Sequence, residues 1–153
     1  MASVNELYNA QFMEHVQHPD YKYVMEDADR SHEGVNPSCG DDLTLQIKLG
    51  DDGRIEEAAF DGHGCAVSMA SADIMSDLVI DKTPEEATAL CELFMRMVRG
   101  EETDDEKLAA LDEAAGLKSV SHMPARVKCA ELAWRTLQEM LKDEQPSAPS
   151  TTE

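Results

Sequence analysis

The sequence predicts an α+β fold, in which a small antiparallel sheet of about three strands carries helices packed on one face. Alternating apolar and polar residues at 43–49 are typical of a half-buried strand. The glycine-bounded turn 50–53 follows, and a second extended stretch returns from Arg54 to Asp61. After Gly64 the apolar spacing changes from two residues to about 3.6, which indicates helices.

The first third of the chain offers fewer signals. Apolar residues between Asn5 and Val16 predict a short amphipathic helix, which His18-Pro19 ends because the residue before a proline avoids the helical region. Residues 20–37 are polar and finish on the turn signal Asn36-Pro37. We therefore expect irregular structure between this helix and the first strand.

Three helices are expected after the hairpin. The first begins near Cys65 and buries one stripe of apolar side chains, namely Val67, Ala70, Ile74 and Leu78. The second begins at the capping box of residues 83–86, with a proline in its first turn, and runs to Arg99 before Gly100. The last runs from about Pro124 to Lys142. The acidic stretch between the last two is expected to be helical only near its end.

The length of 153 residues predicts one domain, which we place at residues 1–144. Residues 145–153 are rich in proline, serine and threonine, and we expect a disordered tail there.

Charge excludes several classes of partner. The chain has 13 basic and 32 acidic residues, a formal net charge of −19. A nucleic acid or an anionic membrane would be repelled by most of this surface. Neither a membrane-spanning stretch nor a secretory signal is visible, so we expect a cytoplasmic protein.

Three of the four cysteines lie where side chains from distant segments can converge. None belongs to a C-x-x-C pair, which excludes a zinc ribbon and a thioredoxin-like motif. Cys39 lies in a loop where Gly40 lets Cys39 and Asp41 point to one place. Cys65 lies at a helix start, where free N–H groups favour the thiolate. Cys129 lies early in the last helix, one turn after Arg126.

Three thiolates and the Asp41 carboxylate would supply the four ligands of a tetrahedral zinc site. Buried cysteines also serve as small apolar side chains, and the residues alone leave both interpretations open. Cys91 is expected to pack in the core between apolar neighbours. His63 is expected to face solvent, and His122 precedes the last helix and is a weaker ligand candidate.

Three ordered motifs resemble the cysteine motifs of the IscU/NifU-N superfamily. They are Asn-Pro-Ser-Cys-Gly-Asp at 36–41, Gly-His-Gly-Cys and the following helix at 62–73, and Pro-Ala-Arg-Val-Lys-Cys-Ala at 124–130. The likeness extends from about Leu7 to Leu141. Within the superfamily, the chain is most similar to SufU. Lys128 stands where scaffold-type members have a histidine, and an added helical segment separates Cys65 from Cys129.

The resemblance implies an IscU/SufU-like fold in which Cys39, Asp41, Cys65 and Cys129 bind zinc and Cys39 accepts sulfur. It implies a sulfurtransferase-like acceptor that takes persulfide sulfur from a SufS-type cysteine desulfurase and passes it to a downstream cluster-assembly scaffold. Helical spacing adds Arg126, which we expect to stabilise the freed thiolate or persulfide. Two alternatives stay open: a scaffold that builds an iron–sulfur cluster on the same ligands, and a non-catalytic zinc module that only docks partners.

Overall fold

The computed structural model describes residues 9–142 and 150–152. Its helices are α2 (Ala10–Gln17), α3 (Ala66–Val79), α4 (Pro84–Val98), α5 (Asp105–Leu108), the 3₁₀ segment η1 (Ala109–His122) and α6 (Pro124–Lys142). Its strands are β1 (Arg30–Asn36), β2 (Asp41–Leu49), β3 (Ile55–His63) and β4 (Ser150–Thr151). None of the helices within these residues combines the length and the apolar character needed to cross a bilayer.

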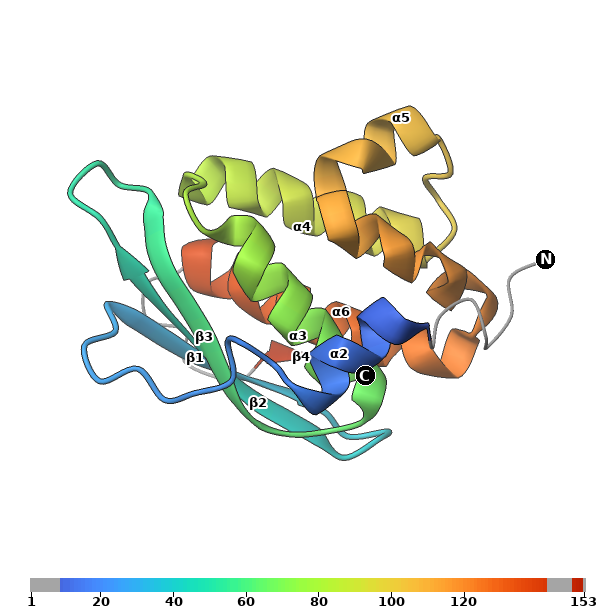
Figure 1. The fold of residues 1–153 in the computed structure, drawn as a ribbon, viewed down its shortest axis with the longest axis horizontal. Helices are drawn as coiled ribbons and strands as arrows, with labels where there is room; N and C mark the ends of the chain where they lie inside the picture. Colours follow the sequence, from blue (N-terminus) through green and yellow to red (C-terminus); the bar gives the residue numbers. More distant parts are fainter. Residues whose placement is uncertain (1–8, 143–149, 153) are drawn as a thin grey trace.

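The sheet has the order β3-β2-β1-β4, and the helices lie over one of its faces (Figure 1). β2 pairs antiparallel with both β1 and β3. α3 and α6 pack on the sheet, and α4 and η1 pack in turn on those two helices. The predicted α+β architecture is confirmed, as are the β2–β3 hairpin and the bounds of α6.

The core lies between the sheet and α6. β2 sends Leu43, Leu45 and Ile47 inward, each at most 2% exposed, as its alternating sequence predicts. Between the two helical layers, Trp134 of α6 stacks on Phe94 of α4, with ring centroids 4.0 Å apart. The packed interior fixes α6, and therefore Cys129, relative to the sheet.

The prediction of irregular structure before the first cysteine is wrong, because residues 30–36 form β1. The inward positions of this strand are His32, Gly34 and Asn36, which do not resemble an apolar face. Gly34 is required by packing, since a Cβ there would lie 2.0 Å from the Thr136 Oγ1 of α6. The strand has a glycine where α6 approaches it, so β1 lacks the alternation of apolar residues by which a strand is predicted.

The last residues of the predicted disordered tail form a strand in the structure. Ser150 and Thr151 form β4, which pairs in parallel with Gly34 and Val35. The Thr152 N–H also donates to the Val35 carbonyl at 3.3 Å. The edge of a sheet has unpaired backbone N–H and C=O groups, and β4 pairs with those on the edge of β1. The rest of the predicted tail lies outside the described residues, and the domain boundary at 144 stays a prediction.

A buried carboxylate joins α2 to the helical layers. The ring of His15 lies between Asp73 of α3, at 2.6 Å, and Glu113 of η1. Asp73 is 1% exposed and also accepts the Tyr21 N–H at 2.9 Å. Asp73 therefore anchors the N-terminal segment to α3.

Stability should therefore depend on pH through His15. Burial lowers the pKa of this ring, but hydrogen bonds to Asp73 and Glu113 outweigh burial and raise it above 6.5. Because the folded-state pKa exceeds the unfolded one, the stabilisation is complete below about pH 6.5 and is lost as the pH rises through the folded pKa. We expect the free energy of unfolding to fall over this range in the wild type and to fall less in His15→Gln, as measured by urea denaturation. His18→Gln, at an exposed position, is the control, and equal slopes in His15→Gln and the wild type would contradict the assignment.

Candidate metal centre

Two distant segments bring a carboxylate and two sulfurs together at one end of the sheet. Cys39 belongs to the turn between β1 and β2, Asp41 is the first residue of β2, and Cys129 lies in the second turn of α6. One ligand atom from each lies within 4.8 Å of the others. The Cys39 and Cys129 sulfurs are 3.4 Å apart. Of the four residues predicted to converge, the structure groups these three, and Cys65 is not one of the group.

The local backbone explains why the turn places Cys39 here. The Cys39 N–H donates to the Asn36 carbonyl at 3.2 Å, which closes the turn. Gly40 has a φ of 73°, a left-handed conformation that other residues rarely adopt. The turn leaves the side chain of Cys39 exposed, whereas Asp41 and Cys129 are buried. One sulfur of the group is therefore accessible and the other is not.

Asp41 connects the group of Cys39, Asp41 and Cys129 to neighbouring segments through hydrogen bonds. It is 2% exposed, and its Oδ1 accepts the backbone N–H of Cys65 at 2.8 Å. Its Oδ2 accepts from the Asn36 side-chain amide at 3.1 Å. Within the described residues, Asp41 forms no ion pair with a basic side chain. A buried carboxylate without a counter-charge is costly, and a divalent cation between Asp41 and the sulfurs would supply that charge.

Cys65 adjoins this group without being one of its three members. It is the N-cap residue of α3 and is half-buried, with its sulfur 3.8 Å from the Ser68 Oγ. A hydrogen bond from Cys129 is the main cause that lowers the pKa of Cys65 to about 6, and the Ser68 N–H and hydroxyl assist against burial. The same hydrogen bond raises the pKa of the Cys129 thiol. The predicted preference for the Cys65 thiolate agrees with this direction, although its main cause is another cysteine.

Asn36 belongs to the site, and the sequence analysis missed it. It is fully buried, and its side-chain amide lies 3.5 Å from the Cys129 sulfur as well as bonding to Asp41. Its Oδ1 has no hydrogen-bond partner among the described residues. The sequence offered only the Asn-Pro turn signal, which does not show that the side chain points inward.

The remaining candidates lie outside the group. Arg126 is half-buried in the first turn of α6. Cys91 is fully buried in the core, which confirms its predicted packing role. His63 ends β3 with its side chain exposed, as expected, and His122 is exposed at the end of η1.

These side chains fit a soft or borderline metal ion. Two thiols and a carboxylate are donors that both zinc and iron accept, and a third thiol is adjacent at Cys65. The uncompensated charge of Asp41 agrees with the same conclusion.

Removing that charge should weaken metal binding. Asp41→Asn keeps the size of the side chain and an oxygen for the Cys65 N–H, but it removes the negative charge. We expect zinc affinity to fall by about 10- to 100-fold, as measured by competition with a chromophoric chelator. Asp42→Asn is the matched control, because Asp42 is the next residue of β2 and is not in the group. Equal affinity in Asp41→Asn and the control would remove Asp41 from the metal site.

Comparison with known proteins places this geometry in a family. Residues 7–130 match the NifU-like N-terminal domain family. The chain is 39% identical over 142 residues to the iron–sulfur cluster assembly scaffold protein IscU of Streptococcus pyogenes, covering 93% of this chain and 87% of the relative. It is 37% identical over 147 residues to the zinc-dependent sulfurtransferase SufU of Bacillus subtilis, covering 94% and 95%.

A solved structure agrees. A protein of Fervidobacterium islandicum, assigned as an iron–sulfur cluster assembly scaffold for the SUF system, is similar with a TM-score of 0.77 and 33% identity, over 91% of this chain and 99% of the other. The matched region contains both segments that form the cluster and the N-cap of α3. The chain therefore belongs to the NifU-like N-terminal domain family, among its IscU/SufU-type iron–sulfur cluster assembly proteins.

Proposed function

We propose that this protein is a zinc-dependent sulfur acceptor that takes persulfide sulfur from a SufS-type cysteine desulfurase. The single observation that carries the proposal is the unequal exposure of the clustered sulfurs. Cys39 is exposed on a turn, whereas Cys129 is buried beneath it at 3.4 Å. A sulfur that must meet a partner's persulfide has to be accessible, and Cys39 meets this requirement.

The transfer step balances without any further reagent. The Cys39 thiolate attacks the outer sulfur of the persulfide on the desulfurase cysteine. A new S–S bond forms on Cys39, the S–S bond of the donor breaks, and the donor cysteine leaves as a thiolate. The persulfide now on Cys39 can be handed to a downstream cluster-assembly scaffold by the same kind of exchange.

Zinc would be held by Cys39, Asp41 and Cys129, with Cys65 as the fourth ligand. The first three are already grouped, and the hydrogen bond that the Cys65 N–H donates to Asp41 holds the backbone of Cys65 beside them. When bound, the ion keeps its thiol ligands deprotonated and protects them from oxidation. The Bacillus subtilis relative named as a zinc-dependent sulfurtransferase supports this choice of metal.

Two basic residues of α6 fit the same proposal. Lys128, next to Cys129, is exposed, and its ammonium group is not a zinc ligand as a histidine would be. Arg126 lies one turn before Cys129, and we assign it to stabilising the anionic sulfur of Cys39 during transfer. The cytoplasmic location expected from the sequence stays a prediction.

Removing the exposed thiol should abolish transfer. We expect Cys39→Ser to fold and to retain zinc on the remaining ligands, but to lose its stimulation of desulfurase turnover, because serine oxygen does not accept sulfane sulfur. The measurement is sulfide or alanine production by a SufS-type desulfurase with and without the variant. Cys91→Ser, which alters a core thiol, is the control. Full stimulation by Cys39→Ser would instead favour a zinc module that only docks the desulfurase.

A second candidate function is a scaffold that assembles an iron–sulfur cluster on the same residues. The Streptococcus pyogenes relative is named as such a scaffold, and thiol ligands suit iron as well as zinc. Protein purified without air separates the two functions. A colourless protein with one zinc ion per chain supports sulfur transfer, and visible absorbance with bound iron and sulfide supports the scaffold.

Metal removal should lower thermal stability. The group of Cys39, Asp41 and Cys129 joins the β1–β2 turn to α6. A metal ion bound to this group therefore favours the folded state by mass action. We expect complete chelation to lower the melting temperature by about 10 °C, because the core persists without the metal. An unchanged melting curve after verified zinc removal would contradict a structural contribution from the metal.

A further inference from the structure

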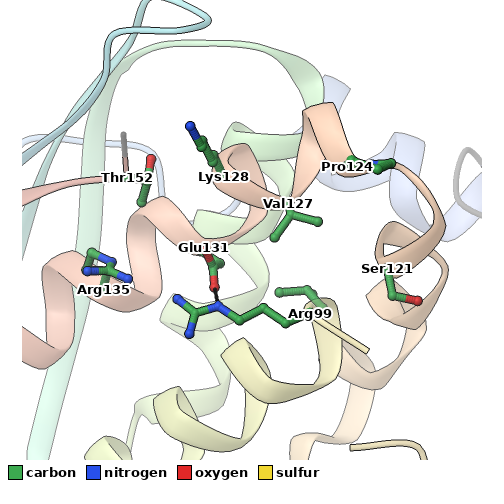
Figure 2. Close-up of a pocket in the computed structure, with 9 residues that line it drawn as sticks. Arg99, Ser121, Pro124, Val127, Lys128, Glu131, Arg135 and Thr152 are labelled. Carbon is green, nitrogen blue, oxygen red and sulfur yellow. Dashed lines mark ion pairs between the residues drawn. The ribbon is translucent and has the colours of Figure 1, made fainter. Parts of the chain in front are cut away.

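A second site lies on another face of α6. A cavity of about 520 Å³ that is open to solvent lies between α6 and the ends of α4 and η1 (Figure 2). Its volume falls within the range of small-molecule sites. Along α6 its wall is made by Pro124, Val127, Lys128, Glu131 and Arg135, whose spacing of three or four residues defines one helical face. The cavity lining does not include any of the four cysteines.

The cavity concentrates positive charge on a strongly acidic protein. Three of the 13 basic residues line it, namely Arg99, Lys128 and Arg135. Its one acidic residue, Glu131, is bound to the Arg99 Nε at 2.6 Å. Among the lining residues that the structure describes, three cations and one carboxylate leave two positive charges uncompensated. On a chain with a net charge of −19, such a patch is a strong local departure.

Two polar groups in the cavity have no partner among the described residues. The Arg135 Nε is inaccessible to solvent and makes no hydrogen bond. Thr152 is 4% exposed, and its Oγ1 is also unpaired. Arg135 and Thr152 lie together at one end of the cavity, and the Arg99–Glu131 pair lies between them and Pro124 (Figure 2). Buried donors without partners indicate that an acceptor belongs beside them.

The cavity also has an apolar wall. Val127 and Pro124 of α6 contribute its accessible part, with Pro124 at the far end, whereas Val98 of α4, which also lines the cavity, is fully buried. Guanidinium groups bind carboxylate and phosphate oxygens with matched geometry, and the apolar wall accommodates a short carbon chain. An ion without a carbon skeleton would leave this wall without contacts.

We propose that this cavity binds a small organic dianion, either a phosphate monoester or a dicarboxylate. Two uncompensated positive charges match the two negative charges of such a ligand. The Arg135 guanidinium and Lys128 hold the anionic groups, and Thr152 donates a hydrogen bond from its hydroxyl. This proposal does not depend on the metal centre or on sulfur transfer.

Calorimetric titration of the full chain with three probes tests the proposal. Glycerol 3-phosphate and succinate represent the two dianion classes, and acetate is the monoanion control. We expect saturable binding of at least one dianion at one site per chain, and the tighter of the two identifies the anionic group. Acetate should bind at least about tenfold more weakly, because it satisfies one cation only.

Variants locate the binding. Lys128→Gln and Arg135→Gln should each weaken dianion binding by about tenfold or more, because each removes a charge-assisted hydrogen bond. Arg54→Gln, which changes an exposed arginine beside the β2–β3 turn, should leave it unchanged. Because Lys128 is exposed, its variant is expected to fold even where Arg135→Gln does not. The proposal is overturned if neither dianion binds, if acetate binds as tightly as the tighter of the two dianions, or if Lys128→Gln binds that dianion like the wild type.

Discussion

The site depends on one buried carboxylate. Asp41 begins β2, and its two oxygens hold the N-terminus of α3 and the side chain of Asn36 at the end of β1. Asn36 in turn contacts the Cys129 sulfur on α6. Three segments far apart in the chain are thus held together through a single charged group. Burying a carboxylate without a cation lowers the stability of the fold, and a metal ion bound beside Asp41 would offset that cost.

Much of the fold follows from local patterns. The alternation in β2, the capping box at Thr83 and the long apolar stripe of α6 each specify an element by itself, and all three are present as expected. The sequence did not predict β1 because its inward positions fit against α6 and are not hydrophobic. Gly34 makes room for Thr136, and Asn36 faces the metal centre. Residues whose type is set by contact with a distant segment do not show the apolar and polar alternation that predicts a strand.

The sequence predicted only part of the site, because the rest depends on contacts between distant segments. The settings of Cys39, Cys65 and Cys129 at ends of elements predicted convergence with Asp41, and the structure groups Cys39, Asp41 and Cys129 but not Cys65. No local pattern reveals that Asn36 points inward or that Cys129 is the main cause of the lowered pKa of Cys65. Both facts depend on the packing of α6 across the sheet. The pairing of His15 with Asp73 and Glu113 was invisible for the same reason, since it joins three separate helical segments.

The exposed position of Cys39 above the buried Cys129 is the reason for proposing Cys39 as the sulfur acceptor. Peptide mass analysis after incubation with a cysteine desulfurase and cysteine, followed by alkylation, tests this claim most directly. We expect the mass of one sulfur atom to be added to the peptide that carries Cys39. Sulfur found on Cys65 or Cys129 with Cys39 unmodified would contradict it, as would the absence of added sulfur under turnover.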